Sequence, residues 1–158
     1  MSAGALGQGL SFGIGVALAG RLNRQNYRTY VLLGDGECDE GQVWEAAMAA
    51  AHFKLDKLAA IVDHNGIQLD GWNKDIMNLE PLNKKWQYFG WNVIESDGHD
   101  IAQLLAAFGK AQQATAQPTV IIAHTIKGKG VSFMENNPDF HGRAPNAEEM
   151  KVALQELE

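Results

Sequence analysis

Two short polar turns carry the residues best suited to chemistry. The tripeptide Gly-Asp-Gly ends one apolar run of the chain, and Asn-Gly-Ile ends another. Asp35 offers a carboxylate and Asn65 an amide oxygen, and oxygen atoms of this kind are the ligands that hard divalent cations prefer. Gly34 and Gly36 lack a Cβ atom and let the backbone approach a ligand closely. The pairing therefore indicates a site for a divalent metal and a diphosphate.

The pattern of apolar residues predicts the elements that position these turns. Short continuous apolar runs that end in polar turns are typical of parallel strands buried on both faces. Apolar residues at helical spacing, such as Val43, Ala47 and Ala51, indicate helices between them. We predict strands at 27–33, 58–62, 91–95 and 119–123, helices at 8–23, 39–52, 82–89, 101–114 and 148–157, and loops at 66–80 and 124–143. The alternation indicates an α/β fold, a doubly wound parallel sheet with helices on both faces, in one domain over residues 1–158.

This topology places several polar side chains at one edge of the sheet. Ligands of open parallel sheets bind outside the carboxyl ends of the strands. Asp35, Asn65, His99 and His124 all fall at or just after a predicted strand end. The helix expected from Asp39 directs its N-terminus toward the same edge, and a helix N-terminus favours an anion.

The anion is best explained as a metal-bridged diphosphate. The sequence contains no Gly-x4-Gly-Lys-Ser/Thr run of the kind that binds nucleoside triphosphates. After Gly7 and Gly9 the third glycine of a dinucleotide-binding fingerprint would fall at Phe12, and no strand precedes the run. Mg²⁺ prefers six oxygen ligands, which Asp35, Asn65, a backbone carbonyl, phosphate oxygens and water can supply.

Composition excludes several other classes of protein. The chain has 158 residues, 46% of them apolar and 20% charged, and a net charge of −6. The negative charge argues against a nucleic-acid partner, and no stretch reaches the roughly 20 apolar residues of a membrane span. Cys38 is the only cysteine, which we interpret as an ordinary thiol in a reducing compartment. These features predict a cytoplasmic protein.

Four segments in order resemble transketolases. They are GALGQGLSFGIGVALAG at 4–20, GDGECDEGQVWEAAMAAAH at 34–52, DHNGIQLDG at 63–71 and TIKGKGVSFMENNPDFHGRAPN at 125–146. The sequence is similar to the N-terminal, diphosphate-binding part of that family, and most of all to the separately encoded N-terminal subunits of split transketolases. The resemblance implies a thiamine diphosphate-binding fold, with Mg²⁺ or Ca²⁺ as the metal.

The resemblance assigns roles to individual residues. It implies that Asp35, Asn65 and the carbonyl of Ile67 ligate the metal, and that Gly34 and Gly36 line the diphosphate.

Four further residues are implied to contact the cofactor or the substrate. Gly4 and Leu6 would approach the cofactor rings, and Leu69 would form an apolar wall near them. His141 matches a catalytic histidine of the family that contacts both the diphosphate and the substrate. These roles follow from the resemblance alone.

The resemblance also implies an enzyme that works as a complex. Such an enzyme moves a two-carbon ketol unit from a ketose phosphate to an aldose phosphate. Glu40 and Glu45 match family glutamates at a subunit interface, where they join a proton-coupling network, so Glu40 counts as a catalytic candidate. The partner would be the C-terminal subunit, whose pyrimidine-binding domain carries the glutamate that activates the cofactor. We therefore expect a homodimer or heterotetramer, and an inactive chain in isolation.

Two alternatives stay open at this point. The family has a helical lead-in before the GALGQG segment that this sequence does not contain, which would suit a truncated, non-catalytic module that binds a partner. Another thiamine enzyme, of the deoxyxylulose-phosphate synthase or 2-oxo-acid dehydrogenase type, is the second alternative. The segments QLDG at 68–71 and KGKG at 127–130 look more like transketolase.

Other histidines and lysines near the predicted edge have less specific patterns. For His124, which follows a strand, a ligand contact and a structural role both stay open. Structural or solvated roles are expected for the others, namely His52, His64, His99, Lys127 and Lys129.

Overall fold

Four parallel strands form the central sheet of the computed structural model, which describes residues 2–158. Their order across the sheet is β1 (Thr29–Gly34), β2 (Leu58–His64), β6 (Thr119–His124) and β5 (Asn92–Asp97). The register pairs Gly34 with Asp63, and His64 with His124, so the carboxyl ends of the strands share one edge. The parallel α/β fold predicted from the alternation of elements is confirmed.

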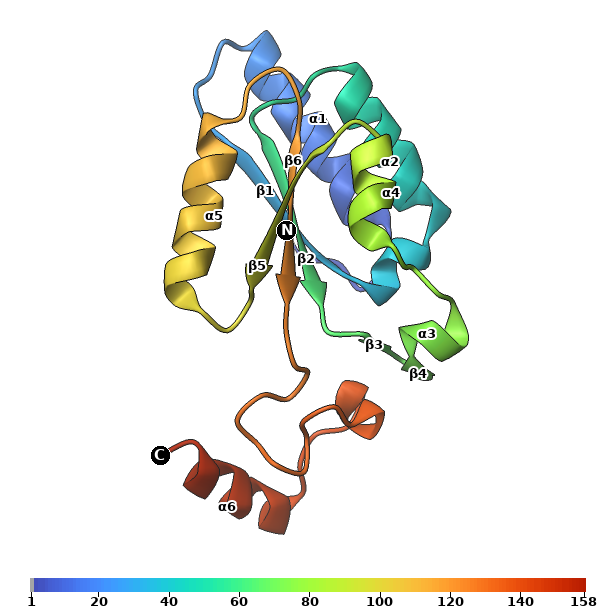
Figure 1. The fold of residues 1–158 in the computed structure, drawn as a ribbon, viewed down its shortest axis with the longest axis vertical. Helices are drawn as coiled ribbons and strands as arrows, with labels where there is room; N and C mark the ends of the chain where they lie inside the picture. The colour runs from blue at the N-terminus through green and yellow to red at the C-terminus, as the bar shows by residue number, and fades with distance from the viewer. Residues whose placement is uncertain (1) are drawn as a thin grey trace.

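Helices cover both faces of this sheet (Figure 1). One face carries α1 (Gln8–Leu22), α2 (Gly41–His52) and α4 (Leu82–Tyr88), and the other carries α5 (Ile101–Gln113). The middle of β6 is apolar because both of its faces are buried. Val120 and Ile122 join the core beneath α1, α2 and α4, whereas Ile121 between them packs with Ala107 and Ala111 of α5.

Aromatic packing fixes α2 and α4 on their face of the sheet. The Trp86 side chain is fully buried, and its ring lies 5.2 Å from that of Trp44 and 4.8 Å from that of Trp91, measured between centroids. The indole of Trp91 also donates to the carbonyl of Ala47 at 3.0 Å. This packing holds the α2 helix, which follows the Gly-Asp-Gly turn, in a defined position.

The segment at 66–80, predicted to be a loop, contains regular structure. It holds a short hairpin, β3 (Ile67–Gln68) with β4 (Gly71–Trp72), followed by α3 (Asn73–Ile76). Gly66 and Gly71 have φ values of 76° and 145°, which favour glycine and allow the tight turns. Two-residue strands are too short to leave an alternating pattern, so no periodic signal marks them in the sequence.

Most other predicted boundaries shift by one or two residues, and two short 3₁₀-helices were not predicted. Helix α2 begins at Gly41 because residues 36–39 form a short 3₁₀-helix, η1 (Gly36–Asp39). The long loop after β6 contains a second one, η2 (Pro138–His141), and α6 (Ala147–Glu156) follows it. The segment after β6 runs beyond the carboxyl edge of the sheet (Figure 1). Within residues 2–158, no helix has both the length and the apolar character that a membrane crossing requires.

Candidate functional site

The carboxylate of Asp35 joins the two turns singled out in the sequence. Asp35 follows β1 directly and is 1% exposed. Its Oδ1 accepts a hydrogen bond from the amide of Gly36 at 2.8 Å, and its Oδ2 accepts one from the amide of Gly66 at 2.6 Å. Its own amide donates to the carbonyl of Asp63 at 3.1 Å. The two turns, which are distant in the chain, therefore lie side by side at the carboxyl edge of the sheet.

A second carboxylate, which was not predicted from the sequence, orients Asn65. The amide nitrogen of Asn65 donates to Oδ2 of Asp63 at 3.1 Å, and its Oδ1 accepts from the backbone amide of Ile67 at 3.0 Å. The other oxygen of Asp63 accepts a hydrogen bond from the hydroxyl of Thr125, beyond β6. Asp63 thus ties the Asn65 turn to the segment that follows β6. In the sequence, only the position of Asp63 two residues before Asn65 pointed to this role.

The donor set fits an oxygen-preferring cation. A carboxylate has about four acceptor positions and an amide oxygen has two, so Asp35 and Asn65 each keep lone pairs beyond the hydrogen bonds they accept. Within residues 2–158, no three His, Cys, Asp or Glu side chains gather as a metal site. A cation held here would need further oxygens from the backbone and from a ligand. Such a mixed shell is how Mg²⁺ is bound beside phosphates.

Glu37 connects the glycine-rich N-terminal segment to the Gly-Asp-Gly turn. Its Oε1 accepts from the amide of Gly7 at 3.0 Å, and its Oε2 accepts from the amide of Gly34 at 3.1 Å. Gly7 has φ of 80°, and a Cβ there would lie 2.8 Å from Cβ of Glu40. The amides of Gly7 and Gly34, from two distant segments, thus donate to the same Glu37 carboxylate. Nothing in the sequence pattern indicated this role for Glu37.

The two glycines of the turn differ in their surroundings. A Cβ on Gly36 would lie 2.6 Å from Cβ of Gln68, whereas a Cβ on Gly34 would have nothing nearer than 3.9 Å. The Gln68 side chain is itself fixed, because its amide donates to Asp39 at 2.9 Å and to Asn73 at 3.0 Å. Gly36 is therefore needed for packing, whereas a side chain at Gly34 would meet no close neighbour.

A cavity of about 680 Å³ lies beside the Asn65 turn. Its volume is within the range of roughly 300–1,000 Å³ typical of small-molecule sites. Its polar lining includes Asp63, Asn65, His99, Thr125, Lys127 and Lys129. The two lysines, expected to be solvated, line this cavity, and Lys129 stays 51% exposed while it pairs with Glu135 at 3.6 Å. His99 keeps the structural role expected of it, because its Nε2 accepts from the amide of Ile126 at 2.8 Å.

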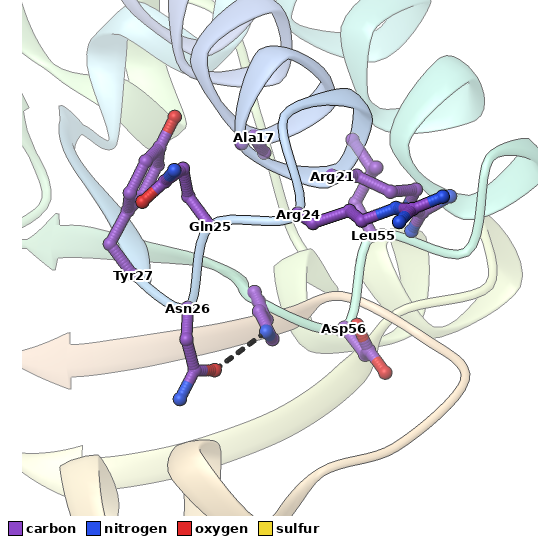
Figure 2. Close-up of a pocket in the computed structure, with 10 residues that line it drawn as sticks. Ala17, Arg21, Arg24, Gln25, Asn26, Tyr27, Leu55 and Asp56 are labelled. Atoms are coloured by element: carbon purple, nitrogen blue, oxygen red, sulfur yellow. Dashed lines mark hydrogen bonds between the residues drawn. The ribbon is translucent and has the colours of Figure 1, made fainter.

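Another cavity, of about 380 Å³, lies at the opposite edge of the sheet and contains none of the predicted residues. Figure 2 shows its wall, where Arg21, Arg24 and Tyr27 gather around the turn before β1. The ammonium of Lys57, which also lines this cavity, donates to the side-chain oxygen of Asn26 at 2.8 Å.

Six other predicted residues are exposed to solvent, namely Gly4, Leu6, Glu40, Glu45, Leu69 and His141. Within the part of the chain that the structure describes, none of them is hydrogen-bonded to Asp35 or Asn65. Glu40 immediately precedes α2 and Glu45 lies on its exposed side.

The segment around His141 is held in place by its neighbours. The guanidinium of Arg143 lies 4.1 Å from the ring centre of Phe140, and it donates to both oxygens of Glu149 at 2.8 and 2.9 Å. These hydrogen bonds lower the pKa of Glu149 to about 2. Helix η2, which ends at His141, contacts β3. The His141 turn is thereby placed near the strand that begins at Ile67.

Cys38 has the structural role expected of it. The side chain is fully buried, and burial is the main cause that raises the pKa of its thiol. The nearby carboxylates of Glu37, Asp35 and Asp39 raise the pKa further. A thiol that remains protonated is a poor nucleophile.

Comparison with known proteins identifies the family. The model of the transketolase thiamine diphosphate binding domain matches residues 1–157. The chain is 42% identical over 157 residues to a subunit of the apulose-4-phosphate transketolase of Phocaeicola vulgatus, covering 99% of this chain and 56% of that protein. It is 44% identical over 158 residues to a 6-deoxy-6-sulfo-D-fructose transketolase subunit of Clostridium sp., covering 100% of this chain and 58% of that protein. The chain thus spans little more than half the length of these relatives.

A solved structure agrees with the sequence comparison. The crystal structure of transketolase from Campylobacter jejuni superposes with a TM-score of 0.92 at 30% identity, over 98% of this chain and 25% of that one. The resemblance predicted from the four motifs is thereby confirmed. The chain belongs to the family of transketolase thiamine diphosphate-binding domains.

Proposed function

We propose that the chain is the diphosphate-binding domain of a split, Mg²⁺-dependent transketolase that acts in the cytoplasm. The assembled enzyme transfers a two-carbon ketol unit from a ketose phosphate to an aldose phosphate. The observation that supports this best is the convergence of the buried Asp35 carboxylate and the Asn65 turn at the carboxyl edge of the sheet, where Asn65 also lines a cavity. Two relatives named as transketolase subunits support the division into two chains.

The residues of this chain anchor and orient the cofactor. Asp35, Asn65 and the carbonyl of Ile67 hold the Mg²⁺ ion, and Gly34 and Gly36 give the diphosphate access to the backbone. When bound, thiamine diphosphate supplies the carbanion-stabilising chemistry of ketol transfer.

The remaining residues face the cofactor rings and the substrate. Gly4, Leu6 and Leu69 contact the rings from exposed positions, and His141 contacts the diphosphate and the substrate. Lys127 lines the cavity and adds positive charge near the phosphates.

The partner is a C-terminal subunit that carries the pyrimidine-binding domain. Glu40 and Glu45, both exposed at the start of α2, lie in the interface of a homodimer or heterotetramer. The partner supplies the group that activates the cofactor ring, so neither chain is active alone.

Reconstitution tests this function directly. The chain, its partner subunit, thiamine diphosphate and Mg²⁺ are combined, and ketol transfer is measured between a ketose phosphate and an aldose phosphate. We expect activity only when all four components are present. A complex that forms but stays inactive with every sugar phosphate pair would instead identify a non-catalytic binding module. Activity with 2-oxo acids in place of ketose phosphates would identify another class of thiamine enzyme.

Replacement of Glu40 with glutamine tests its interface role. The change removes a charge and a proton acceptor while keeping the shape of the side chain. Groups that transfer protons contribute about 10²–10⁴-fold to rates, so we expect kcat of the assembled enzyme to fall by roughly 10²-fold or more. Glu148→Gln, an exposed change on α6, is the control and should leave kcat unchanged. An unchanged kcat in Glu40→Gln, in a complex that still assembles, would remove Glu40 from the mechanism.

A further inference from the structure

A pair of histidines joins the ends of two central strands beside the diphosphate site. His64 ends β2 and His124 ends β6, and the register places them directly opposite one another. Their Nδ1 atoms lie 3.0 Å apart, and the ring planes are inclined by 73°. Neither residue has a place in the proposed ketol transfer. Two ring nitrogens that face each other this closely need either a hydrogen atom or a metal ion between them.

Two carboxylates fix the other side of each ring. Nε2 of His64 lies 2.9 Å from Glu80, and Nε2 of His124 lies 2.9 Å from Glu95. Because carboxylates only accept hydrogen bonds, both Nε2 atoms carry a hydrogen. The lone pairs of both rings are thereby directed to their Nδ1 atoms, which face each other. A carboxylate behind each histidine is the usual second shell of a metal-bound imidazole.

We infer that His64 and His124 form a binding site for a divalent transition-metal ion, with Nδ1 of each ring as the ligand. Bonds of about 2.0–2.1 Å to two nitrogens 3.0 Å apart subtend an angle of roughly 95°. An angle near 90° suits the square-planar or octahedral coordination of an ion such as Ni²⁺. Solvent completes the coordination, because the side chain of His124 is 48% exposed and that of His64 is 21% exposed.

The histidine site and the oxygen site around Asp35 prefer different metal ions. Imidazole nitrogens suit Ni²⁺, Cu²⁺ and Zn²⁺, whereas Mg²⁺ prefers oxygen ligands. An excess of Mg²⁺ therefore leaves the histidine pair free for a transition metal. The two sites can be measured separately, so the inference does not depend on the proposed transketolase activity.

Titration of the untagged chain with Ni²⁺ in the presence of excess Mg²⁺ tests the inference by calorimetry. We expect one Ni²⁺ per chain, and we expect His64→Gln and His124→Gln each to abolish saturable binding. Glu95→Gln should weaken binding by about 10–100-fold, the usual effect of losing an outer-shell partner. His52→Ala, a change at an exposed histidine on α2, is the matched control and should bind as the unmodified chain does.

Nitrogen NMR of the unmodified chain gives a second readout that does not depend on any variant folding. Ni²⁺ should perturb Nδ1 of both rings, and diamagnetic Zn²⁺ should shift these two nitrogens while both Nε2 atoms stay protonated. A single proton between the nitrogens is the other occupant that fits the 3.0 Å separation. In that case Ni²⁺ gives no saturable binding, which overturns the inference. Binding through Nε2, or full binding in both glutamine variants, overturns it as well.

Discussion

Replacement of Asp35 with alanine is expected to abolish Mg²⁺-dependent binding of thiamine diphosphate and the activity of the assembled enzyme. The change removes one of the two side chains proposed to ligate the metal. Loss of an outer-shell partner already weakens metal binding by about 10–100-fold, so loss of a direct ligand should exceed that range. Calorimetric titration of the subunit complex with thiamine diphosphate, with and without Mg²⁺, measures the effect.

Stability has to be measured beside binding in the Asp35→Ala variant. The carboxylate accepts hydrogen bonds from the amides of Gly36 and Gly66, and the side chain is buried. An unsatisfied buried amide costs about 1–3 kcal/mol, so the free energy of unfolding should also fall by a few kcal/mol. Asp35→Asn keeps the size of the side chain and removes its charge, and should lose metal binding with a smaller loss of stability. Asp70→Asn, at an exposed carboxylate, is the control. Wild-type cofactor affinity in Asp35→Asn would refute the assigned metal role.

The sheet could be predicted because its sequence signals are local and consistent. Continuous apolar runs such as 119–123 mark strands buried on both faces. In this run Val120 and Ile122 pack in the core on one face of the sheet, and Ile121 packs in the core on the other. The carboxyl-edge rule then brought Asp35 and Asn65 together without any knowledge of the contacts. The hydrogen bond from the amide of Gly66 to Asp35 shows that the two turns do lie side by side.

The supporting residues could not be predicted because their roles depend on tertiary contacts. Glu37 binds the amides of Gly7 and Gly34, and only the folded chain brings these segments together. Similarly, His64 acquires a partner only because β6 lies beside β2, although β5 comes between them in the sequence. Periodicity reports which face of an element is buried, and it does not report which polar groups meet at the end of a strand.

Replacement of Gly36 and Gly34 with alanine should separate packing from cofactor binding at the same turn. A methyl group on Gly36 would lie 2.6 Å from Cβ of Gln68, which cannot move freely because Asp39 and Asn73 hold its amide. Overpacking of this kind costs about 1–3 kcal/mol, so Gly36→Ala should lower the free energy of unfolding by that amount. A shift of Gln68 also displaces the adjacent Ile67, a proposed metal ligand. Cofactor affinity should therefore fall with stability.

Gly34→Ala should affect binding alone. The added methyl group would meet nothing closer than 3.9 Å, so the free energy of unfolding should stay within about 0.5 kcal/mol of the unmodified value. If the diphosphate approaches the backbone here, the methyl group occupies its path and thiamine diphosphate affinity falls. Gly109→Ala, in open space on α5, is the control, and it should raise stability by about 0.5–1 kcal/mol without changing binding. Unchanged cofactor affinity in Gly34→Ala would mean that the diphosphate lies elsewhere on this edge, because no other feature of the chain opposes a side chain at that position.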